Sequence, residues 1–418
     1  MSATAAPIVN FSQGVPDAAL CPDFFRTAAQ REENAELRAK NIGYCPDNAG
    51  LIEVRRAVAD SFNLFYRPTA RIIPQQVMLA SGCTSACVAA MRHYEEYQRS
   101  SAEQPIALLQ SPTYHFYKKQ LHQLGVPWQM ITMPDVTGLS AAQRLTPIIN
   151  ALTLYPGRDI LLVLNTPANP TGDVYPPAFT EKLAELLKNN PSLSVLEDTI
   201  YERLVFADGV TPTSVFAAVS SDDAASRRVY HASGLSKAWA FPAGRLGYLI
   251  GHPEVIQDID NAQDLMVGQM PIDSQLQLLT ALTKTDELCP GYHKAFNDYL
   301  RHNAAQLLAL LEHMPALRIH PPQAGIYGFV QGDESAIKAL HAASKQRGLL
   351  FPGVQQFGEP GLRFNIAVHH DTFAAALQLF SEAARAEGIL IGQPPELNVR
   401  LIPVFNEVIR GVGALSGN

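Results

Sequence analysis

The sequence predicts an α/β protein whose large domain holds a mostly parallel β-sheet covered by helices, joined to a smaller α+β domain. Three observations predict this fold class. Short apolar segments alternate with amphipathic helical segments from about residue 48 to residue 275, which is typical of βαβ units whose strands are buried on both faces. From about Asp273 onward, long helical patterns dominate and only short strands follow. The length of 418 residues also exceeds the ~100–200 residues of one typical domain.

The individual elements follow from apolar runs and from helical periodicity. Strands of the large domain are expected, in chain order, at Gln76–Ala80, Ile106–Gln110, Asp159–Leu164, Ser194–Glu197, Arg228–His231 and Gly247–Ile250. Helices are expected between them at Leu51–Phe65, Ser85–Tyr97, Tyr114–Leu124 and Pro177–Leu187. The smaller domain is expected to contain short strands near Gly325–Val330 and Gly361–Ile366.

These elements divide the chain into a large domain at residues 45–275 and a small domain made of residues 1–44 and 276–388. Residues 389–418 are expected to form a C-terminal extension. Within it, Pro394-Pro395 precede the apolar run Leu401–Leu415, which we interpret as an extra helix packed on the surface.

Composition excludes several classes of protein. The formal net charge of −7 argues against a nucleic-acid partner or a polybasic membrane contact. No apolar run approaches the ~20 residues that span a bilayer, and the first residues lack the pattern of a secretion signal, so a cytoplasmic location is expected. The cysteines are scattered, which favours a reducing compartment. Cys83 and Cys87 have helical spacing, but no second Cys/His cluster accompanies them, so no metal site is expected.

The segment HASGLSKAWAFPAGRLGY (231–248) is the most informative about chemistry. Lys237 follows a strand and a Ser/Gly turn, which is a position where a lysine can be held and partly desolvated for reaction with a carbonyl group. Arg245 lies eight residues later, and with the hydroxyls of Ser233 and Ser236 it can bind a phosphate. By itself the segment is also compatible with an ordinary solvated loop.

Two further segments place polar side chains where strands end. In LLVLNTPANPTGDVY (161–175), Asn169 follows a buried strand, at the edge of an α/β sheet where ligands bind. In SVLEDTIYERLVF (194–206), Asp198 ends a strand and Tyr201 follows it, so that the carboxylate can pair with a protonated ring nitrogen. The alternatives are a plain turn at Asn169 and a helix N-cap at Asp198.

A fourth segment, QVMLASGCTSACVAAM (76–91), runs from a strand through Gly82, Cys83 and Thr84 into a helix. Backbone N–H groups at the start of a helix bind anions, and the helix dipole favours negative charge there. The segment therefore indicates an anion site, although such strand-to-helix junctions are common.

The order of these segments resembles the class I/II aminotransferases, which are pyridoxal-phosphate (PLP) enzymes of fold type I. The resemblance extends through residue 385 and implies a seven-stranded, mostly parallel sheet. Besides the Ser-Gly-Cys-Thr turn, the matching pieces are GYCPDNAGLIEVRRAVA (43–59), SPTYHFY (111–117), NPTG (169–172), DTIY (198–201), SKAWAFPAGRLGY (236–248), PGVQQFG (352–358) and LRFNIA (362–367). Each piece is short, but their joint occurrence in this order is specific.

The resemblance implies a role for each matching residue. Lys237 is similar to the lysine that carries PLP as a Schiff base and moves protons, and Asp198 to the partner of the pyridine nitrogen. Arg363 is similar to the arginine that binds the substrate α-carboxylate. Residues implied around the cofactor or the substrate are Gly14, Gly82, Cys83, Thr84, Tyr114, Asn169, Tyr201, Ser233, Ser236 and Arg245. Tyr44 is similar to a tyrosine that reaches the phosphate of the neighbouring subunit, which implies a homodimer with shared active sites.

The activity implied is transfer of the amino group from an amino acid to a 2-oxo acid. A PLP-dependent lyase, cyclase or oxidase acting on an amino acid stays an alternative, because such enzymes share the same motifs. Two features depart from the usual pattern. Met270-Pro271 stand where relatives often have small hydroxyl residues, and the tail beyond residue 388 exceeds the usual family ending. No motif places a second cation for a side-chain carboxylate, so the sequence leaves the substrate side chain open.

Overall fold

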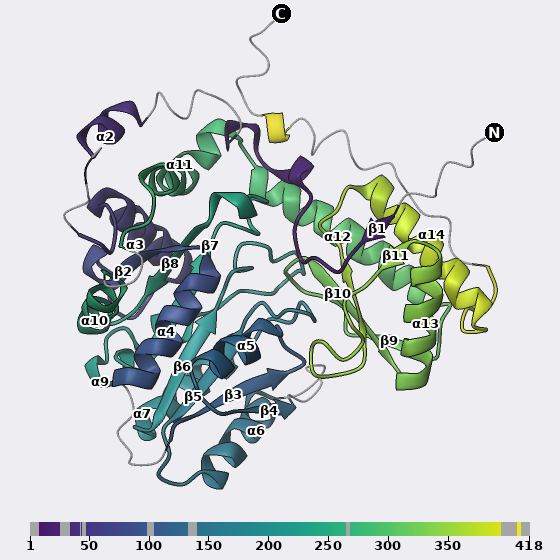
Figure 1. Ribbon diagram of the computed structural model, residues 1–418, viewed down its shortest axis with the longest axis horizontal. Coiled ribbons are helices and arrows are strands. Elements are labelled where there is room, and N and C mark those ends of the chain that lie inside the picture. The colour runs from purple at the N-terminus through teal and green to yellow at the C-terminus, as the bar shows by residue number, and fades with distance from the viewer. Residues whose placement is uncertain are drawn as a thin grey trace, which may run out of the picture.

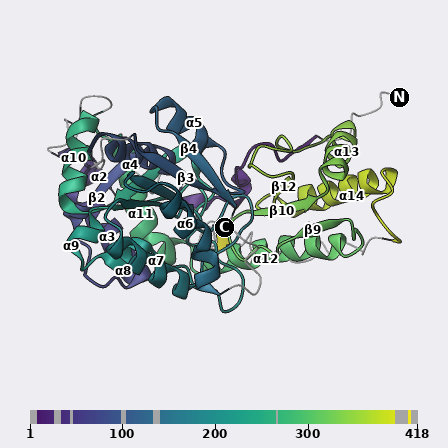
Figure 2. The same ribbon diagram turned by 90° about the horizontal axis from the view of Figure 1, so that it is seen from below.

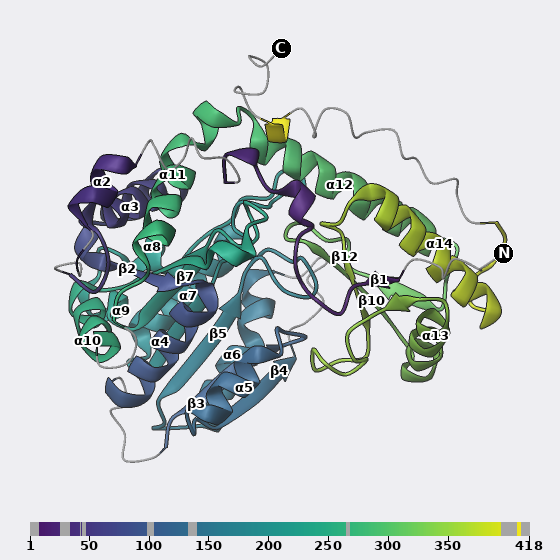
Figure 3. The same cartoon turned by 45° about the horizontal axis from the view of Figure 1, so that its top comes forward.

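The structure is a computed structural model that describes residues 8–25, 34–41, 43, 47–97, 104–132, 140–264, 268–393 and 408–410. Its elements form two lobes, and the long helix α12 (Tyr292–Leu311) runs from one lobe to the other (Figures 1 and 3). Figure 2 shows the same two lobes from below, with the sheet of the larger lobe on the left and helices α13 and α14 of the smaller lobe on the right.

The larger lobe is built on a seven-stranded sheet with the strand order β2-β8-β7-β6-β5-β3-β4. Its strands are β2 (Val77–Ser81), β3 (Ile106–Ser111), β4 (Trp128–Thr132), β5 (Ile160–Asn165), β6 (Leu193–Asp198), β7 (Val229–Gly234) and β8 (Leu246–Ile250). Strand β8 is antiparallel to β2 and β7, and the other neighbours are parallel. The predicted fold class, a mostly parallel seven-stranded α/β sheet beside a smaller α+β unit, is confirmed.

Helices cover both faces of this sheet. They are α2 (Ala35–Lys40), α3 (Ile52–Tyr66), α4 (Cys83–Tyr97), α5 (Phe116–Gln123), α6 (Ala141–Leu154), α7 (Pro177–Asn189), α8 (Val215–Val219), α9 (Asp223–Ser226), α10 (Pro253–Asp264) and α11 (Ile272–Leu288). Side chains alternate between the faces along a strand. On β7, Tyr230 therefore contacts His93 of α4, whereas His231 contacts Phe62 of α3 on the opposite face.

The smaller lobe combines helices with two small sheets. Strands β9 (Leu317–Ile319), β10 (Tyr327–Gly332) and β12 (Leu362–Asn365) form an antiparallel sheet in the order β12-β10-β9. Strand β1 (Val9–Asn10) pairs in parallel with β11 (Leu349–Leu350), so the N-terminal segment lies in this lobe, as Figure 3 also shows. Helices α13 (Glu334–Gln346) and α14 (His370–Ala386) complete it. The division of the chain into domains at 45–275, 1–44 with 276–388, and 389–418 stays a prediction.

The structure contains several elements without a predicted counterpart, and three differences bear on the sheet and the site. Strand β4 was not predicted, because it is an edge strand of the sheet with a partly exposed Trp128 rather than a fully apolar run. Helix α6 was also not predicted, and Pro147 lies inside it. The helix expected from Tyr114 begins at Phe116, which leaves Tyr114 in the loop that follows β3.

Only three residues of the expected C-terminal extension beyond Gln393 are described. They form a single helical turn at 408–410, in which Ile409 is buried and its carbonyl oxygen lies 3.6 Å from Sγ of Cys289. The rest of the apolar run Leu401–Leu415 lies outside the described residues. Within the described part of the chain, no helix is both long and apolar enough to cross a bilayer.

Candidate active site

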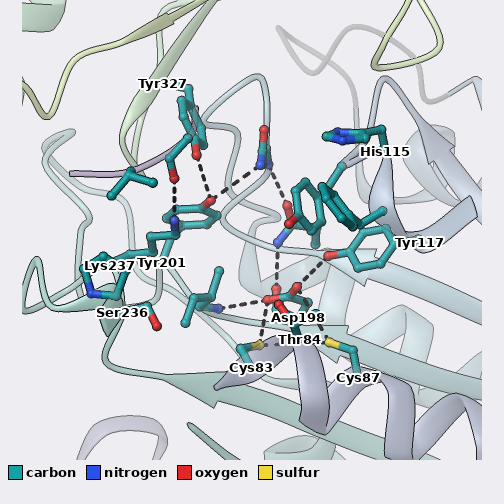
Figure 4. Close-up of a pocket in the computed structure, with 18 of the residues that line it drawn as sticks. Cys83, Thr84, Cys87, His115, Tyr117, Asp198, Tyr201, Ser236, Lys237 and Tyr327 are labelled. Carbon is teal, nitrogen blue, oxygen red and sulfur yellow. Dashed lines mark hydrogen bonds between the residues drawn. The ribbon is translucent and has the colours of Figure 1, made fainter. Parts of the chain in front are cut away.

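A cavity of about 450 Å³ opens at the carboxyl ends of the parallel strands, between the two lobes. Strands β5 and β6 contribute Asn165 and Asp198, and the loop after β7 contributes Lys237 (Figure 4). Ligands bind at this edge of open α/β sheets because the strand ends and the following loops converge there. The smaller lobe closes the cavity with Tyr327 of β10 and Arg363 of β12.

Asp198 lies at the base of the cavity and accepts several hydrogen bonds. Tyr117 Oη donates to Oδ2 at 2.6 Å, and the backbone N–H of Ile200 donates to Oδ1 at 3.2 Å. The thiols of Cys83 and Cys87 lie 3.3 and 3.8 Å from the carboxylate oxygens. Burial raises the pKa of Asp198, and the hydrogen bonds from Tyr117 and Ile200 oppose that shift. The carboxylate is therefore held in one orientation by donors from α5, from α4 and from the backbone that follows β6.

Cys83, Cys87 and Asp198 offer three possible metal ligands within 4.8 Å of one another. Structural zinc sites use four ligands, and catalytic zinc sites use three together with water. The thiols have raised pKa values, in Cys83 chiefly because of the hydrogen bond with Cys87 and because of burial. A thiolate is the form that binds metal, so these protonated thiols act as hydrogen-bond donors to Asp198.

Lys237 stands on the wall of the cavity, and its Nζ donates a hydrogen bond to the backbone oxygen of Gly14 (Figure 4). Loss of hydration lowers the pKa of Lys237, and the nearby Arg363 lowers it further. Gly14 belongs to the N-terminal segment and has no room for a side chain, because a Cβ there would lie 2.1 Å from Oη of Tyr327. The N-terminal segment therefore closes tightly over the lysine.

One end of the cavity is suited to an anion. Helix α4 begins at Cys83, and its first N–H groups, with Thr84, face this end, where Ser236 and Arg245 also line the cavity. Gly82 has a φ of +86°, and a Cβ there would lie 2.3 Å from the Arg245 guanidinium. Among the described residues, no carboxylate forms an ion pair with Arg245, whose guanidinium donates to carbonyl oxygens of Pro242 and Ser81.

Ser233, which was expected near the phosphate, does not line this cavity. The hydroxyl of Ser233 donates to Oε1 of Glu202 at 3.1 Å, on the same face of β7 as His231 and away from α4. Residues two apart on a strand share a face, which explains why Ser233 follows His231 rather than Lys237. Tyr44, the residue expected to serve a neighbouring subunit, lies outside the described residues.

Arg363 lies at the other end of the cavity and is buried, with 2% of its surface exposed. Its guanidinium carbon lies 4.2 Å from the ring centre of Tyr327 and 4.8 Å from that of Phe357, and Nη1 donates to Oδ1 of Asn169 at 3.1 Å. Its Nε has no hydrogen-bond partner. No carboxylate of the described residues pairs with Arg363. Because an unpaired buried charge is costly, the arrangement indicates a site for an anionic group.

Asn169 and Tyr201 lie between these two ends. The side-chain amide of Asn169 is 3.5 Å from Oη of Tyr201, which in turn lies 3.4 Å from Oη of Tyr327 (Figure 4). Burial raises the pKa of Tyr201. In Tyr327 burial acts in the same direction, but the positive charges of Arg363 and Lys237 outweigh it and lower the pKa. The two phenols therefore differ, with Tyr327 the more acidic.

Aromatic side chains cover the cavity opposite Lys237. Tyr114 lines the cavity and stacks on Phe116, with ring centres 5.3 Å apart. His115 lies beside them, and the amide nitrogen of Gln356 is 3.0 Å from its Nδ1. Burial and the neighbouring Lys119 lower the pKa of His115 to about 4, so its imidazole is neutral near pH 7.

Four residues that line the cavity were not predicted from the sequence: Cys87, Tyr117, Tyr327 and Gln356. Tyr117 lies within the SPTYHFY motif, three residues after Tyr114, so helical spacing could have indicated it. Tyr327 lies on a short apolar strand of the smaller lobe, where its residues resemble core residues. Gln356 lies in the matching piece PGVQQFG (352–358), which could have indicated it. The predicted residues that the structure does bring to the cavity lining are Gly14, Cys83, Thr84, Tyr114, Asn169, Asp198, Tyr201, Ser236, Lys237, Arg245 and Arg363.

The fold and this site together define a class of enzyme. A family model described as aminotransferase class I and II matches residues 6–378, so the chain belongs to the class I/II aminotransferase family and is an aminotransferase. Among curated proteins, the chain is similar to the bifunctional aspartate aminotransferase and glutamate/aspartate-prephenate aminotransferase of Petunia hybrida, with 25% identity covering 90% of this chain and 76% of the relative. It is also similar to the probable aspartate/prephenate aminotransferase of Aquifex aeolicus, with 24% identity covering 92% of both chains.

Solved structures show the same fold. Aspartate aminotransferase from Thermus thermophilus with maleate superposes with a TM-score of 0.72 and 22% identity, covering 90% of this chain and 91% of that one. The aromatic aminotransferase from Pyrococcus horikoshii superposes with a TM-score of 0.76 and 18% identity, covering 93% and 98%. The predicted family and the aminotransferase activity are thus confirmed.

Proposed function

We propose that the cavity binds PLP and that the enzyme uses Lys237 to move the amino group of an amino acid to a 2-oxo acid. The observation that carries this proposal is the position of Lys237 between two cations, Arg245 and Arg363, that have no carboxylate partner among the described residues. One cation suits the phosphate of the cofactor and the other suits the carboxylate of the substrate. Family membership implies the same cofactor.

The residues at the α4 end fit a phosphate. Gly82, with a φ of +86°, lets the backbone lie so close to the Arg245 guanidinium that a Cβ would not fit. The N-terminus of helix α4 adds free N–H groups. Thr84 and Ser236 add hydroxyl donors at the same end. Ser233 has no part in this proposal, because its hydroxyl bonds to Glu202.

Asp198 would hold a proton at the ring nitrogen of the cofactor. Tyr117 and the thiols of Cys83 and Cys87 orient its carboxylate from behind. Tyr114 would stack on the ring, and Asn169 and Tyr201 would donate to its phenolic oxygen. When bound, PLP supplies an electron sink that stabilises negative charge on the substrate α-carbon.

Lys237 would perform the proton transfers. Its lowered pKa favours the neutral amine, which is the form that attacks a carbonyl carbon and accepts a proton. Once free, Nζ of Lys237 would accept the proton from the α-carbon of the substrate and donate it again within the same site, which is the proton transfer that moving an amino group requires. Arg363 would bind the α-carboxylate with its planar fork and so fix which bond to the α-carbon is broken.

The proposal is tested on protein purified with PLP. Borohydride reduction should abolish a visible absorbance band, and peptide mapping should find the pyridoxyl group on Lys237. A label on another lysine would remove Lys237 from this role. Incubation with an amino acid alone should release the 2-oxo acid in an amount that does not exceed the enzyme, and turnover should then require a 2-oxo acid acceptor. Continuous release of pyruvate or ammonia without acceptor would favour a lyase.

We also infer a homodimer in which Tyr44 serves the cofactor phosphate of the neighbouring subunit. The support is the family resemblance of the Gly43-Tyr44 segment and its position directly before α3. The relatives are named for aspartate, glutamate or prephenate, and the end of the cavity that would hold a substrate side chain determines whether this chain prefers the same substrates.

A further inference from the structure

The part of the cavity left for a substrate side chain lies around His115. If Arg363 binds the α-carboxylate and Lys237 faces the α-carbon, as proposed above, the side chain must point away from both. Figure 4 shows His115 across the cavity from Lys237. Phe357, which stacks under Arg363, also contacts His115, with ring centres 6.1 Å apart. This end is therefore adjacent to the carboxylate site.

Among the described residues, no lysine or arginine of the cavity lining is left to pair with a group at this end, although the charges of Lys118 and Lys119 are close enough to lower the pKa of His115. The lysines and arginines that line the cavity are Lys237, Arg245 and Arg363, and each is already required elsewhere. Lys118 lies over Trp128 and Lys119 lies over Phe116, and neither lines the cavity. Met270, from the segment where the sequence departs from its relatives, is buried at 3% exposure and brings no charge.

The groups that do face this end are aromatic or neutral. Phe116 is 40% exposed and stacks on Tyr114, so it presents an apolar ring to the opening. His115 is neutral near pH 7, with a pKa lowered to about 4 by burial and by Lys119. The amide of Gln356 is already engaged, since its nitrogen contacts His115 and its oxygen accepts from the N–H of Gly353 at 3.3 Å.

We propose that the preferred amino donor has a large uncharged side chain, an aromatic one above all, and that His115, Phe116 and Gln356 select it against aspartate and glutamate. A side-chain carboxylate placed here would lose water without a direct ion pair to a lining residue of the described chain, whereas an aromatic ring would stack on rings already present. The inference rests on the aminotransferase function proposed above and departs from the dicarboxylic substrates for which the curated relatives are named.

The test measures the first half of the reaction, so that the 2-oxo acid acceptor does not interfere. Holoenzyme is mixed with excess phenylalanine, tyrosine, aspartate or glutamate, and the change in cofactor absorbance gives a second-order rate constant for each. We expect phenylalanine or tyrosine to exceed aspartate and glutamate at least tenfold. Calorimetry should agree, with 3-phenylpropionate binding more tightly than succinate. Equal or faster reaction with the dicarboxylic amino acids would overturn the inference.

A charge-adding variant tests the residues themselves. His115→Arg should move the ratio of aspartate to phenylalanine rate constants at least tenfold toward aspartate. The matched control is His122→Arg, which adds the same charge to an exposed position of α5 and should leave the ratio unchanged. If His115→Arg does not fold, Gln356→Arg makes the same prediction. An unchanged ratio in a folded variant would remove these residues from selectivity.

Failure of this inference differs from failure of the proposed function. If aspartate or glutamate leads while Lys237 carries the cofactor, only the side-chain assignment is wrong. If no amino acid changes the cofactor absorbance, the aminotransferase mechanism proposed for this site is wrong as well.

Discussion

Arg363→Lys tests whether the buried guanidinium binds the substrate carboxylate. Lysine keeps the positive charge but loses the planar fork and its stacking on Tyr327 and Phe357. The loss of one charge-assisted hydrogen bond is worth about 1.5–3 kcal/mol, and the loss of stacking on the rings about 0.5–1 kcal/mol. The sum of about 2–4 kcal/mol corresponds to a fall of about 30- to 900-fold in kcat/KM for an amino acid.

The assay compares an amino acid with the amine that has the same side chain but no carboxylate. The amine cannot use Arg363, so its kcat/KM should change by less than about threefold in the variant. Thermal unfolding of the variant separates this effect from a loss of folding. Equal falls in kcat/KM for the amino acid and the amine would place Arg363 outside the carboxylate site. They would refute the inference that a buried arginine without a carboxylate partner marks the site of an anionic group.

Three further predictions concern other parts of the molecule. Tyr327→Phe removes the hydroxyl that lies 3.4 Å from that of Tyr201. The loss of one neutral hydrogen bond, worth about 0.5–1.5 kcal/mol, should lower kcat about 2- to 12-fold without a comparable rise in KM. An unchanged kcat would contradict this prediction. Burial lowers the pKa of His293 to about 3, so between pH 6.5 and 3 the unfolded chain binds more protons and stability falls as the pH falls. Between pH 7.5 and 5, the free energy of unfolding measured with urea should fall by up to about 2 kcal/mol less in His293→Leu than in the wild type. Equal falls in the two proteins would show that another group causes the pH dependence. Mixing Lys237→Ala with Tyr44→Asp subunits should restore activity in the hybrid dimer, and hybrids that form without activity would exclude a shared site.

Local sequence was sufficient for most of the sheet and for the residues at its strand ends. Apolar runs and turn residues act over a few neighbouring positions, so the strands that end near Asn169 and Asp198 were placed to within one residue. The strand before Lys237 was predicted to end three residues too early. The same local signals failed at β4, an edge strand in which only Ile131 is buried. They also extended the helix at Tyr114 too far, because loop and helix residues there have similar composition.

Side-chain direction could be only partly inferred. Ser233 belongs to the motif that contains Lys237. Its side chain nevertheless faces Glu202, because it lies two residues after His231 on β7 and therefore on the same face of the strand. The pleat has a period of two residues, so the sequence contained this information once the strand was known to extend to Gly234. Its hydroxyl close to Lys237 in the sequence and the family resemblance both assigned Ser233 to the phosphate.

What the sequence determined by itself is the class of fold, the family, and the residues that lie on short motifs. What only the tertiary structure decided is which distant residues meet: Arg363 contacts Asn169 across 194 positions, Tyr327 contacts Tyr201 across 126, and Lys237 contacts Gly14 across 223. The physical reason is that these contacts depend on how two lobes and an N-terminal segment close around one cavity. Packing of the whole chain sets that closure, and no local pattern of hydrophobic or turn residues records it.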